Sequence, residues 1–89
     1  MTTRLAPRAV AQLEKIHAYI ERDQPGAAAA TIASILDTIE RLAAYPYMGR
    51  SGRRKGTREL IHGAFVIVYR IHEDAIEIAA VFHGNQRYE

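Results

Sequence analysis

The sequence predicts an α+β domain in which an N-terminal antiparallel helical hairpin packs on a small C-terminal antiparallel β-sheet. Apolar residues recur at intervals of three and four through the first half of the chain, which is the period of an amphipathic helix. After a basic, glycine-containing segment the residues become β-branched and aromatic in short runs, which is typical of strands. With 89 residues, 48% of them hydrophobic, we expect one domain spanning residues 1–89.

The first helix is expected over Pro7–Arg22, after a short edge strand near Thr3–Ala6. Proline suits the first turn of a helix, where its missing N–H is not needed. Apolar and aromatic side chains then form one stripe at helical spacing. This stripe consists of Val10, Leu13, Ile16, His17 and Ile20.

The second helix is expected over Gly26–Ala44, because Pro25 and Gly26 interrupt the first pattern. Its apolar residues follow one another at steps of four and three, which gives a narrow seam suited to packing along another helix. They are Ala28, Ile32, Ile35, Ile39 and Leu42. Tyr45-Pro46 ends the helix, since a residue before proline disfavours the helical region. The short connection predicts antiparallel neighbours.

Three strands are expected near Arg58–His62, Ala64–His72 and Ala75–His83. A turn at Glu73-Asp74 would make the last two strands a hairpin. In that register one face carries the pairs Ile71–Ile76, Tyr69–Ile78, Ile67–Ala80 and Phe65–Phe82. All these pairs are apolar or aromatic, so this face should rest on the helices. The predicted core joins Phe65, Tyr69, Ile78 and Phe82 to Leu13, Ile16, Ile35 and Ile39.

The opposite face of the predicted hairpin is half apolar and half charged. It pairs Val66, Val68 and Arg70 with Val81, Ala79 and Glu77. Solvent-facing positions of a small antiparallel sheet are usually more polar. We therefore expect something else to cover Val66, Val68 and Val81. The alternative is that these residues are present for their β propensity alone.

The composition indicates the cellular compartment in which the protein is expected. Cysteine is absent, so neither disulfides nor thiolate zinc sites are available, which fits a reducing compartment. The segment Met1–Leu5 reaches polar residues too early for a secretory signal. No apolar run approaches membrane-spanning length. We expect a cytoplasmic protein without membrane association.

The net charge is only +2, but cations gather in one short segment. They are Arg50, Arg53, Arg54, Lys55 and Arg58. The segment Gly49–Thr57 does not have the spacing of a nucleotide-binding P-loop, because Lys55 precedes Gly56. These cations are candidates for binding phosphate or an acidic partner. The alternative is a solvated loop that keeps the protein soluble.

The four histidines do not suggest a metal site, since they have no acidic companions at ligand spacing, and we expect no metal and no cofactor. His83, Arg87 and Tyr88 at the end of the last strand are of more interest. A metal-free ribonuclease needs a base for the 2′-hydroxyl, cations for the phosphate and an acid for the leaving oxygen. These three residue types could supply those roles. The alternative is a strand end with a solvated tail.

The ordered set of segments resembles the RelE/ParE superfamily of type II toxin–antitoxin toxins, and more closely its ParE-like branch. The matching segments are Leu5-Ala6-Pro7-Arg8-Ala9-Val10, Arg41-Leu42, Tyr45-Pro46-Tyr47-Met48-Gly49-Arg50, Thr57-Arg58-Glu59-Leu60, Val66-Ile67-Val68-Tyr69-Arg70-Ile71 and Val81-Phe82-His83-Gly84. The resemblance implies a helical hairpin on a small antiparallel sheet. It also implies a bacterial or plasmid operon that encodes a cognate antitoxin, whose extended or helical C-terminal segment wraps the toxin. Val66, Val68 and Val81 are the candidate antitoxin-facing residues.

The resemblance leaves two targets open. RelE-type members cut mRNA in the ribosomal A site, whereas ParE-type members poison DNA gyrase and lack a full nuclease set. Arg58, Arg70, His83, Arg87 and Tyr88 are the candidate catalytic residues of a metal-independent mRNA endoribonuclease. Lys55 is the only lysine outside the first helix, whereas RelE relies on several, and the helical hairpin is long. These features favour gyrase poisoning. An inactive relative that only binds an antitoxin is a third alternative.

Overall fold

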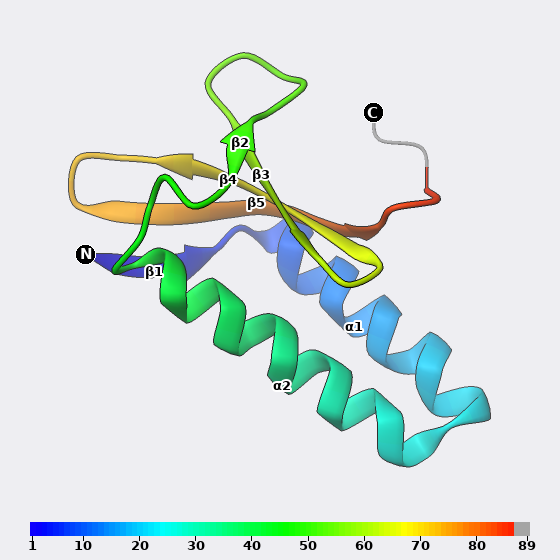
Figure 1. Ribbon diagram of the computed structural model, residues 1–89. Coiled ribbons are helices and arrows are strands. Elements are labelled where there is room, and N and C mark those ends of the chain that lie inside the picture. Colours follow the sequence, from blue (N-terminus) through cyan, green and yellow to red (C-terminus); the bar gives the residue numbers. More distant parts are fainter. Residues whose placement is uncertain (87–89) are drawn as a thin grey trace.

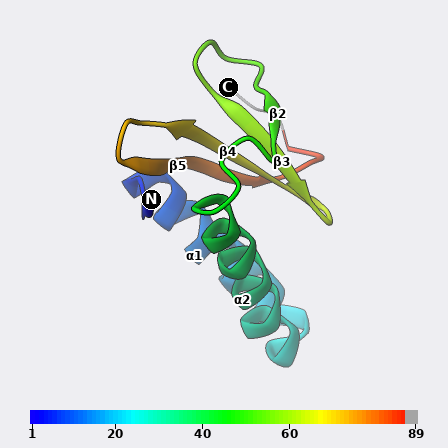
Figure 2. The ribbon, with the colours of Figure 1, turned by 60° about the vertical axis from the view of Figure 1, so that its left-hand side comes forward.

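The computed structural model describes residues 1–86 as two helices and a five-stranded sheet (Figure 1). The elements in chain order are β1 (Thr2–Leu5), α1 (Pro7–Asp23), α2 (Pro25–Leu42), β2 (Arg50–Ser51), β3 (Arg58–His62), β4 (Phe65–Ile71) and β5 (Ala75–His83). The two helices form an antiparallel hairpin against one face of the sheet, and the loop between β2 and β3 rises on the opposite side (Figures 1 and 2). The predicted α+β architecture is confirmed.

The sheet is mixed, which corrects the prediction of a purely antiparallel one. Its strand order is β1-β5-β4-β3-β2, and β1 lies parallel to β5 while the other neighbours are antiparallel. The short strand β2 was not expected and pairs Arg50 with Glu59. Both differences involve short edge strands: β1 pairs with a strand about seventy residues away, and β2 is only two residues long.

The main core lies between the helices and the sheet. Leu13 of α1, Ile35 and Ile39 of α2, and Tyr69 and Ile78 of the sheet are buried there, as predicted. Ile16 and Phe65 are only partly buried at its border. Helix and strand boundaries agree with the predicted ranges to within two residues. No helix in residues 1–86 is both long and apolar enough to cross a bilayer.

The predicted register of the β4–β5 hairpin is correct near its turn and wrong beyond it. Ile71 pairs with Ile76 and Tyr69 with Ile78, but Val68 pairs with Ala80, so Ala79 is the extra residue of a bulge. The predicted pairs Ile67–Ala80 and Phe65–Phe82 are therefore replaced by Ile67–Val81, Val66–Phe82 and Phe65–His83. The run from Ala79 to Phe82 is apolar throughout, so either register buries apolar groups and the pattern cannot distinguish them.

The bulge exchanges the faces of two residues. Val81 turns into the main core and is 0% exposed, whereas Phe82 moves to the opposite face. There Phe82 joins Val66, Val68 and Ala80 in a second buried cluster. This chain by itself therefore buries Val66, Val68 and Val81. The sequence had predicted that something else would cover them. The guanidinium of Arg53 lies 5.6 Å from the centre of the Phe82 ring, so the basic loop itself helps to cover this face.

Candidate functional site

The segment between α2 and β2 is fixed to the sheet by one buried tyrosine. The Tyr69 hydroxyl donates to the carbonyl of Pro46 (2.7 Å) and accepts from the N–H of Gly49 (3.0 Å). A Cβ at Gly49 would lie 2.7 Å from both the Tyr69 hydroxyl and the Glu59 carbonyl oxygen. Only glycine therefore allows this close approach, and the segment delivers Arg50 to the start of the basic loop.

Arg58 is engaged with this same segment. Its guanidinium donates to the carbonyl oxygens of Gly49 and Tyr47 and lies 5.1 Å from the centre of the Tyr47 ring. The guanidinium therefore serves mainly as a clamp on the backbone. Because Arg58 pairs with Tyr69, its side chain lies on the helix side of the sheet.

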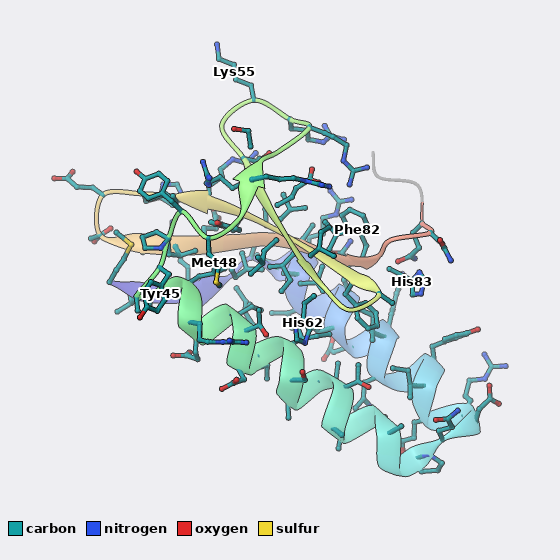
Figure 3. The ribbon with its side chains drawn as sticks, viewed as in Figure 1. Tyr45, Met48, Lys55, His62, Phe82 and His83 are labelled. Atoms are coloured by element: carbon teal, nitrogen blue, oxygen red, sulfur yellow. The ribbon has the colours of Figure 1, made fainter. Side chains whose placement is uncertain are left out.

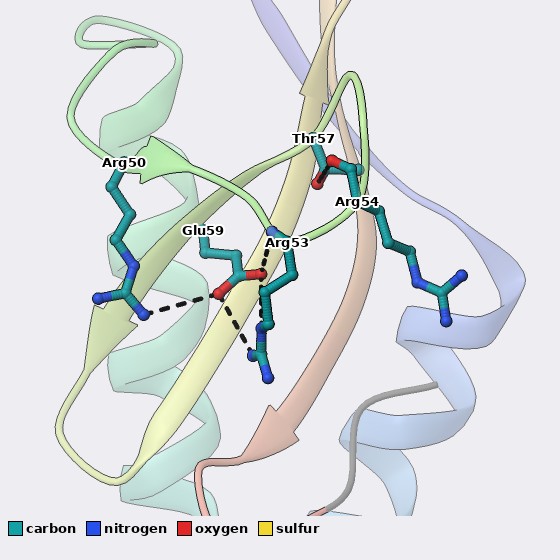
Figure 4. A network of polar contacts seen from close by, with 5 residues as sticks. All are labelled: Arg50, Arg53, Arg54, Thr57 and Glu59. Atoms are coloured by element: carbon teal, nitrogen blue, oxygen red, sulfur yellow. Dashed lines mark hydrogen bonds and ion pairs between the residues drawn. The ribbon is translucent and has the colours of Figure 1, made fainter.

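Glu59 is the centre of a polar network on the opposite face (Figure 4). Its side chain is 1% exposed. One carboxylate oxygen accepts from the backbone N–H of Arg53 (3.0 Å) and from its Nε (3.1 Å). The other accepts from Arg53 Nη2 at 3.3 Å and lies 3.7 Å from Arg50 Nη2. This carboxylate was not singled out in the sequence, although a lone acid beside five cations could have indicated it.

The network lowers the pKa of Glu59. Burial by itself raises the pKa, but hydrogen bonds from the side chain and backbone of Arg53, and the charges of Arg53 and Arg50, more than offset it. The carboxylate is therefore ionised at neutral pH. Two of the five predicted binding cations therefore contact this buried carboxylate. Arg53 binds Glu59 and lies over the Phe82 ring, and Arg50 lies beside Glu59.

Arg54 and Lys55 lie at the tip of the loop, and both are exposed. Thr57 holds the loop by donating its hydroxyl and its N–H to the carbonyl of Arg54, at 2.6 and 3.1 Å. Lys55 points away from the body of the protein (Figure 3), and Arg54 extends away from Glu59 (Figure 4). A shallow hollow of about 430 Å³ lies beside them, bordered by Tyr47 and Arg58. Two exposed positive charges therefore lie together at the loop tip.

His83 lies at the far end of β5. Its Nδ1 accepts from the N–H of Asn85 at 3.1 Å, and its ring meets Phe65 edge-on, with centroids 5.7 Å apart. It borders a cleft of about 640 Å³ between α1 and the ends of β4 and β5. The polar lining also includes Gln12, Lys15 and Gln86.

The predicted nuclease residues that the structure describes, Arg58, Arg70 and His83, are not gathered in one place. Arg58 of β3 pairs with Tyr69, and His83 of β5 pairs with Phe65. The backbone positions of Arg58 and His83 are therefore separated by four residues along the strand direction and by two strand spacings, or roughly 16 Å. Arg70 neighbours Tyr69 in the strand and therefore points to the opposite face, near Glu77. Arg87 and Tyr88 lie outside the described residues.

A second polar cluster, not predicted from the sequence, joins α2 to the end of β3. The Thr38 hydroxyl donates to the carbonyl of Ser34 at 3.0 Å, so its oxygen is left to accept from His62 Nδ1 at 3.2 Å. His62 Nε2 then accepts from the Ser34 hydroxyl at 2.7 Å. The cluster attaches a helix to a strand end. Within the described part of the chain, histidine and acidic side chains do not form a group able to hold a metal ion.

The fold described above agrees with the comparisons of this chain to known protein families and structures. Residues 3–88 match the family of ParE toxins of type II toxin–antitoxin systems, parDE. The chain belongs to the ParE toxin family. It is 46% identical over 83 residues to Y4kP of Sinorhizobium fredii, described as a candidate toxin, covering 91% of this chain and 85% of that one.

A second relative and two solved structures extend the likeness of this ParE-family chain. It is 35% identical over 88 residues to toxin RelE3 of Caulobacter vibrioides, with 93% and 94% of the two chains covered. Its fold matches the chromosomal ParDE toxin–antitoxin system of P. aeruginosa with a TM-score of 0.85 and 22% identity, over 93% and 95% of the chains. It also matches the toxin–antitoxin complex RelBE2 of Mycobacterium tuberculosis, with a TM-score of 0.71, 23% identity, and 92% and 88% coverage.

Proposed function

We propose that this ParE-family toxin arrests growth by poisoning DNA gyrase and that a cognate antitoxin, encoded beside it, neutralises it. The observation that carries the choice of target is the dispersal of the candidate nuclease groups within residues 1–86. A nuclease must hold a cation and a proton-transfer group within hydrogen-bond reach of one phosphate. Arg58 and His83 are roughly 16 Å apart by strand geometry, and Arg58 is already bound to backbone carbonyls.

The alternative is a RelE-like, ribosome-dependent mRNA endoribonuclease. The observation in its favour is the likeness to a relative described as toxin RelE3 and to the RelBE2 complex. Such an activity would have to assemble its site on the ribosome, because the described residues do not present one. An inactive relative that only binds an antitoxin is a third candidate, and the same experiment decides it.

The antitoxin is expected to meet the tip of the basic loop with acidic residues. Arg54 and Lys55 are exposed there, whereas Arg53 is engaged with Glu59 and Phe82. Charge reversal at Arg53 would therefore damage the fold, and the electrostatic contribution is better tested at Arg54 and Lys55. Charges at the rim of an interface act mainly on association rate and its salt dependence.

The test is induction of the toxin in a bacterial host, with and without the adjacent reading frame. We expect growth arrest relieved by the neighbouring protein, purified toxin that stabilises gyrase-cleaved DNA, and ribosome-bound mRNA that stays intact. Codon-phased mRNA cleavage by the wild type that is lost in His83→Ala or Tyr88→Phe would establish the nuclease alternative. A chain that binds the neighbouring protein but neither arrests growth nor affects gyrase or mRNA would be the inactive relative.

A further inference from the structure

The hydroxyl of Ser34 contacts an imidazole whose tautomer is fixed by its neighbours. Ser34 is an exposed residue of α2, and its Oγ lies 2.7 Å from His62 Nε2. The Thr38 hydroxyl gives its hydrogen to the carbonyl of Ser34 at 3.0 Å and accepts from Arg41 Nη2 at 3.3 Å. Toward His62 Nδ1, which is 3.2 Å away, the Thr38 oxygen can therefore act only as an acceptor.

In the neutral ring this order of hydrogen bonds makes His62 Nε2 an acceptor. The hydrogen is on Nδ1, so the lone pair of Nε2 accepts from the Ser34 hydroxyl. A serine bonded to a base, with the base oriented by a third group, is the arrangement that activates a hydroxyl as a nucleophile. Thr38 occupies the place that a carboxylate has in many serine enzymes.

A shallow hollow of about 280 Å³ adjoins this pair, between α2 and the β3–β4 turn. Its lining on the helix side includes the small residues Ala30 and Thr31. On the other side it includes Gly63 and Ala64 of the turn, whose backbone N–H groups are donors of the kind that stabilise an oxyanion. Figure 3 shows the His62 side chain at this junction of α2 and the sheet. The hollow has room for a small acyl group beside the Ser34 oxygen.

We propose that Ser34 is an acyl-accepting serine, a modification site for small activated esters, and that His62 is its general base. The Ser34 oxygen attacks the ester carbonyl carbon while its proton passes to His62 Nε2. The bond from that carbon to the leaving oxygen then breaks, and the leaving oxygen takes the proton from His62. The products are an O-acyl serine and a free alcohol, so the step needs neither an oxidant nor a reductant.

Thr38 is a positioning residue in this scheme, because it contacts the imidazole and not the ester. By holding the hydrogen on Nδ1 it keeps Nε2 available as the base. The proposal concerns a surface between α2 and β3 and does not depend on the proposed growth arrest or on its target.

The first measurement treats the full purified toxin with p-nitrophenyl acetate at neutral pH and locates acetyl groups by peptide mass spectrometry. Ser34 should be acetylated about 100-fold faster than Ser51 or more, because general-base assistance contributes about 10²–10⁴-fold. Ser51 is the internal control, since it is exposed in β2 and pairs with Arg58, four residues or about 13 Å along β3 from His62. Hydroxylamine removes acetyl groups from serine esters and leaves lysine amides in place, which separates the two kinds of product.

The second measurement removes the base. His62→Gln should slow acetylation of Ser34 by about 100-fold or more. His17→Gln, at a histidine of α1 that pairs with Glu21, is the matched control and should leave the rate unchanged. Circular dichroism and thermal unfolding establish that both variants are folded.

Substitutions at Thr38 test the positioning role. Thr38→Val leaves Nδ1 without its acceptor, so the hydrogen can move to Nε2 and the rate should fall by about tenfold or more. Thr38→Ser keeps the hydroxyl and should retain the wild-type rate within about threefold. A role in packing alone would instead give the two variants equal rates, and that result would contradict the positioning role.

The wild-type comparison decides the proposal without any variant. Acetylation of Ser34 no faster than that of Ser51 would overturn it. Acetylation of Ser34 at the wild-type rate in folded His62→Gln would overturn it as well, because the base would then contribute nothing. Either result would leave the cluster as an attachment of α2 to β3 and would leave the proposed function intact.

Discussion

Glu59→Gln should destabilise the protein at neutral pH by about 2–3 kcal/mol. The carboxylate accepts three hydrogen bonds from Arg53 and is 1% exposed. Each hydrogen bond to a charged group contributes about 1.5–3 kcal/mol, against about 0.5–1.5 kcal/mol for a neutral pair, so bonds to the one remaining oxygen of glutamine are weaker. The NH2 group that replaces the other oxygen cannot accept a bond from Arg53. Two effects reduce the total: an amide costs less to bury than a carboxylate, and the Arg53 side chain, 54% exposed, regains water.

Thermal and urea unfolding at pH 7 measure this loss. For a domain of this size we expect the melting temperature to fall by about 10–20 °C. Glu73→Gln, at an exposed position in the β4–β5 turn, removes the same charge without a buried network and should change stability by less than about 0.5 kcal/mol. An equal effect of the two substitutions would contradict the structural role assigned to Glu59.

The pH dependence gives a second check on the same residue. Because the folded-state pKa of Glu59 is lowered from its ordinary 4.5, its ionised form stabilises the fold above about pH 4.5. That stabilisation is lost as the pH falls through the lowered folded-state value. The stability difference between wild type and Glu59→Gln should therefore be full at pH 7 and shrink steadily below pH 4.5. A difference that stays constant down to pH 3 would refute the reasoning.

Four further outcomes are expected. Tyr69→Phe should cost about 1–3 kcal/mol in urea unfolding, because the carbonyl of Pro46 and the N–H of Gly49 lose their buried partner; an unchanged midpoint would show that water replaces the hydroxyl. Phe82→Ala should cost about 3 kcal/mol, the lower end for a buried aromatic, since Arg53 can settle into the space; a loss below 1 kcal/mol would mean that the second cluster is not cohesive. Joint reversal of Arg54 and Lys55 to Glu should slow antitoxin association and flatten its salt dependence in stopped-flow mixing, and indifference to both changes would exclude an electrostatic role. His83→Ala should retain growth arrest in an induction assay, whereas a loss of several orders of magnitude in toxicity with normal folding would favour the nuclease.

The same network alters how the basic segment is understood. In the sequence, five cations close together suggest one electrostatic surface. In the structure Arg53 and Arg50 contact the buried Glu59 carboxylate and Arg58 donates to backbone carbonyls, whereas Arg54 and Lys55 lie exposed at the loop tip. Charge density along a chain does not reveal which cations the fold uses for itself.

The sequence alone determined the helices, the three main strands and their order, because each has a strong local period and clear turn signals. Pro7 and Pro25 begin helices, Tyr45-Pro46 lies beyond the end of the second, and the turn after Ile71 pairs Ile71 with Ile76. These features depend on neighbouring residues and on which side chains avoid water, so they can be read from the order of residues.

Only the tertiary structure decided which face Phe82 and Val81 occupy, where β1 pairs, and what Glu59 holds. The bulge at Ala79 lies in an apolar run that satisfies either register, and β1 pairs with a strand about seventy residues away. The hydrogen bond from the N–H of Val81 to the side chain of Gln12 likewise exists only because the fold brings α1 and the end of β5 together. Long-range pairing and buried polar contacts depend on geometry between distant segments, which local patterns do not encode.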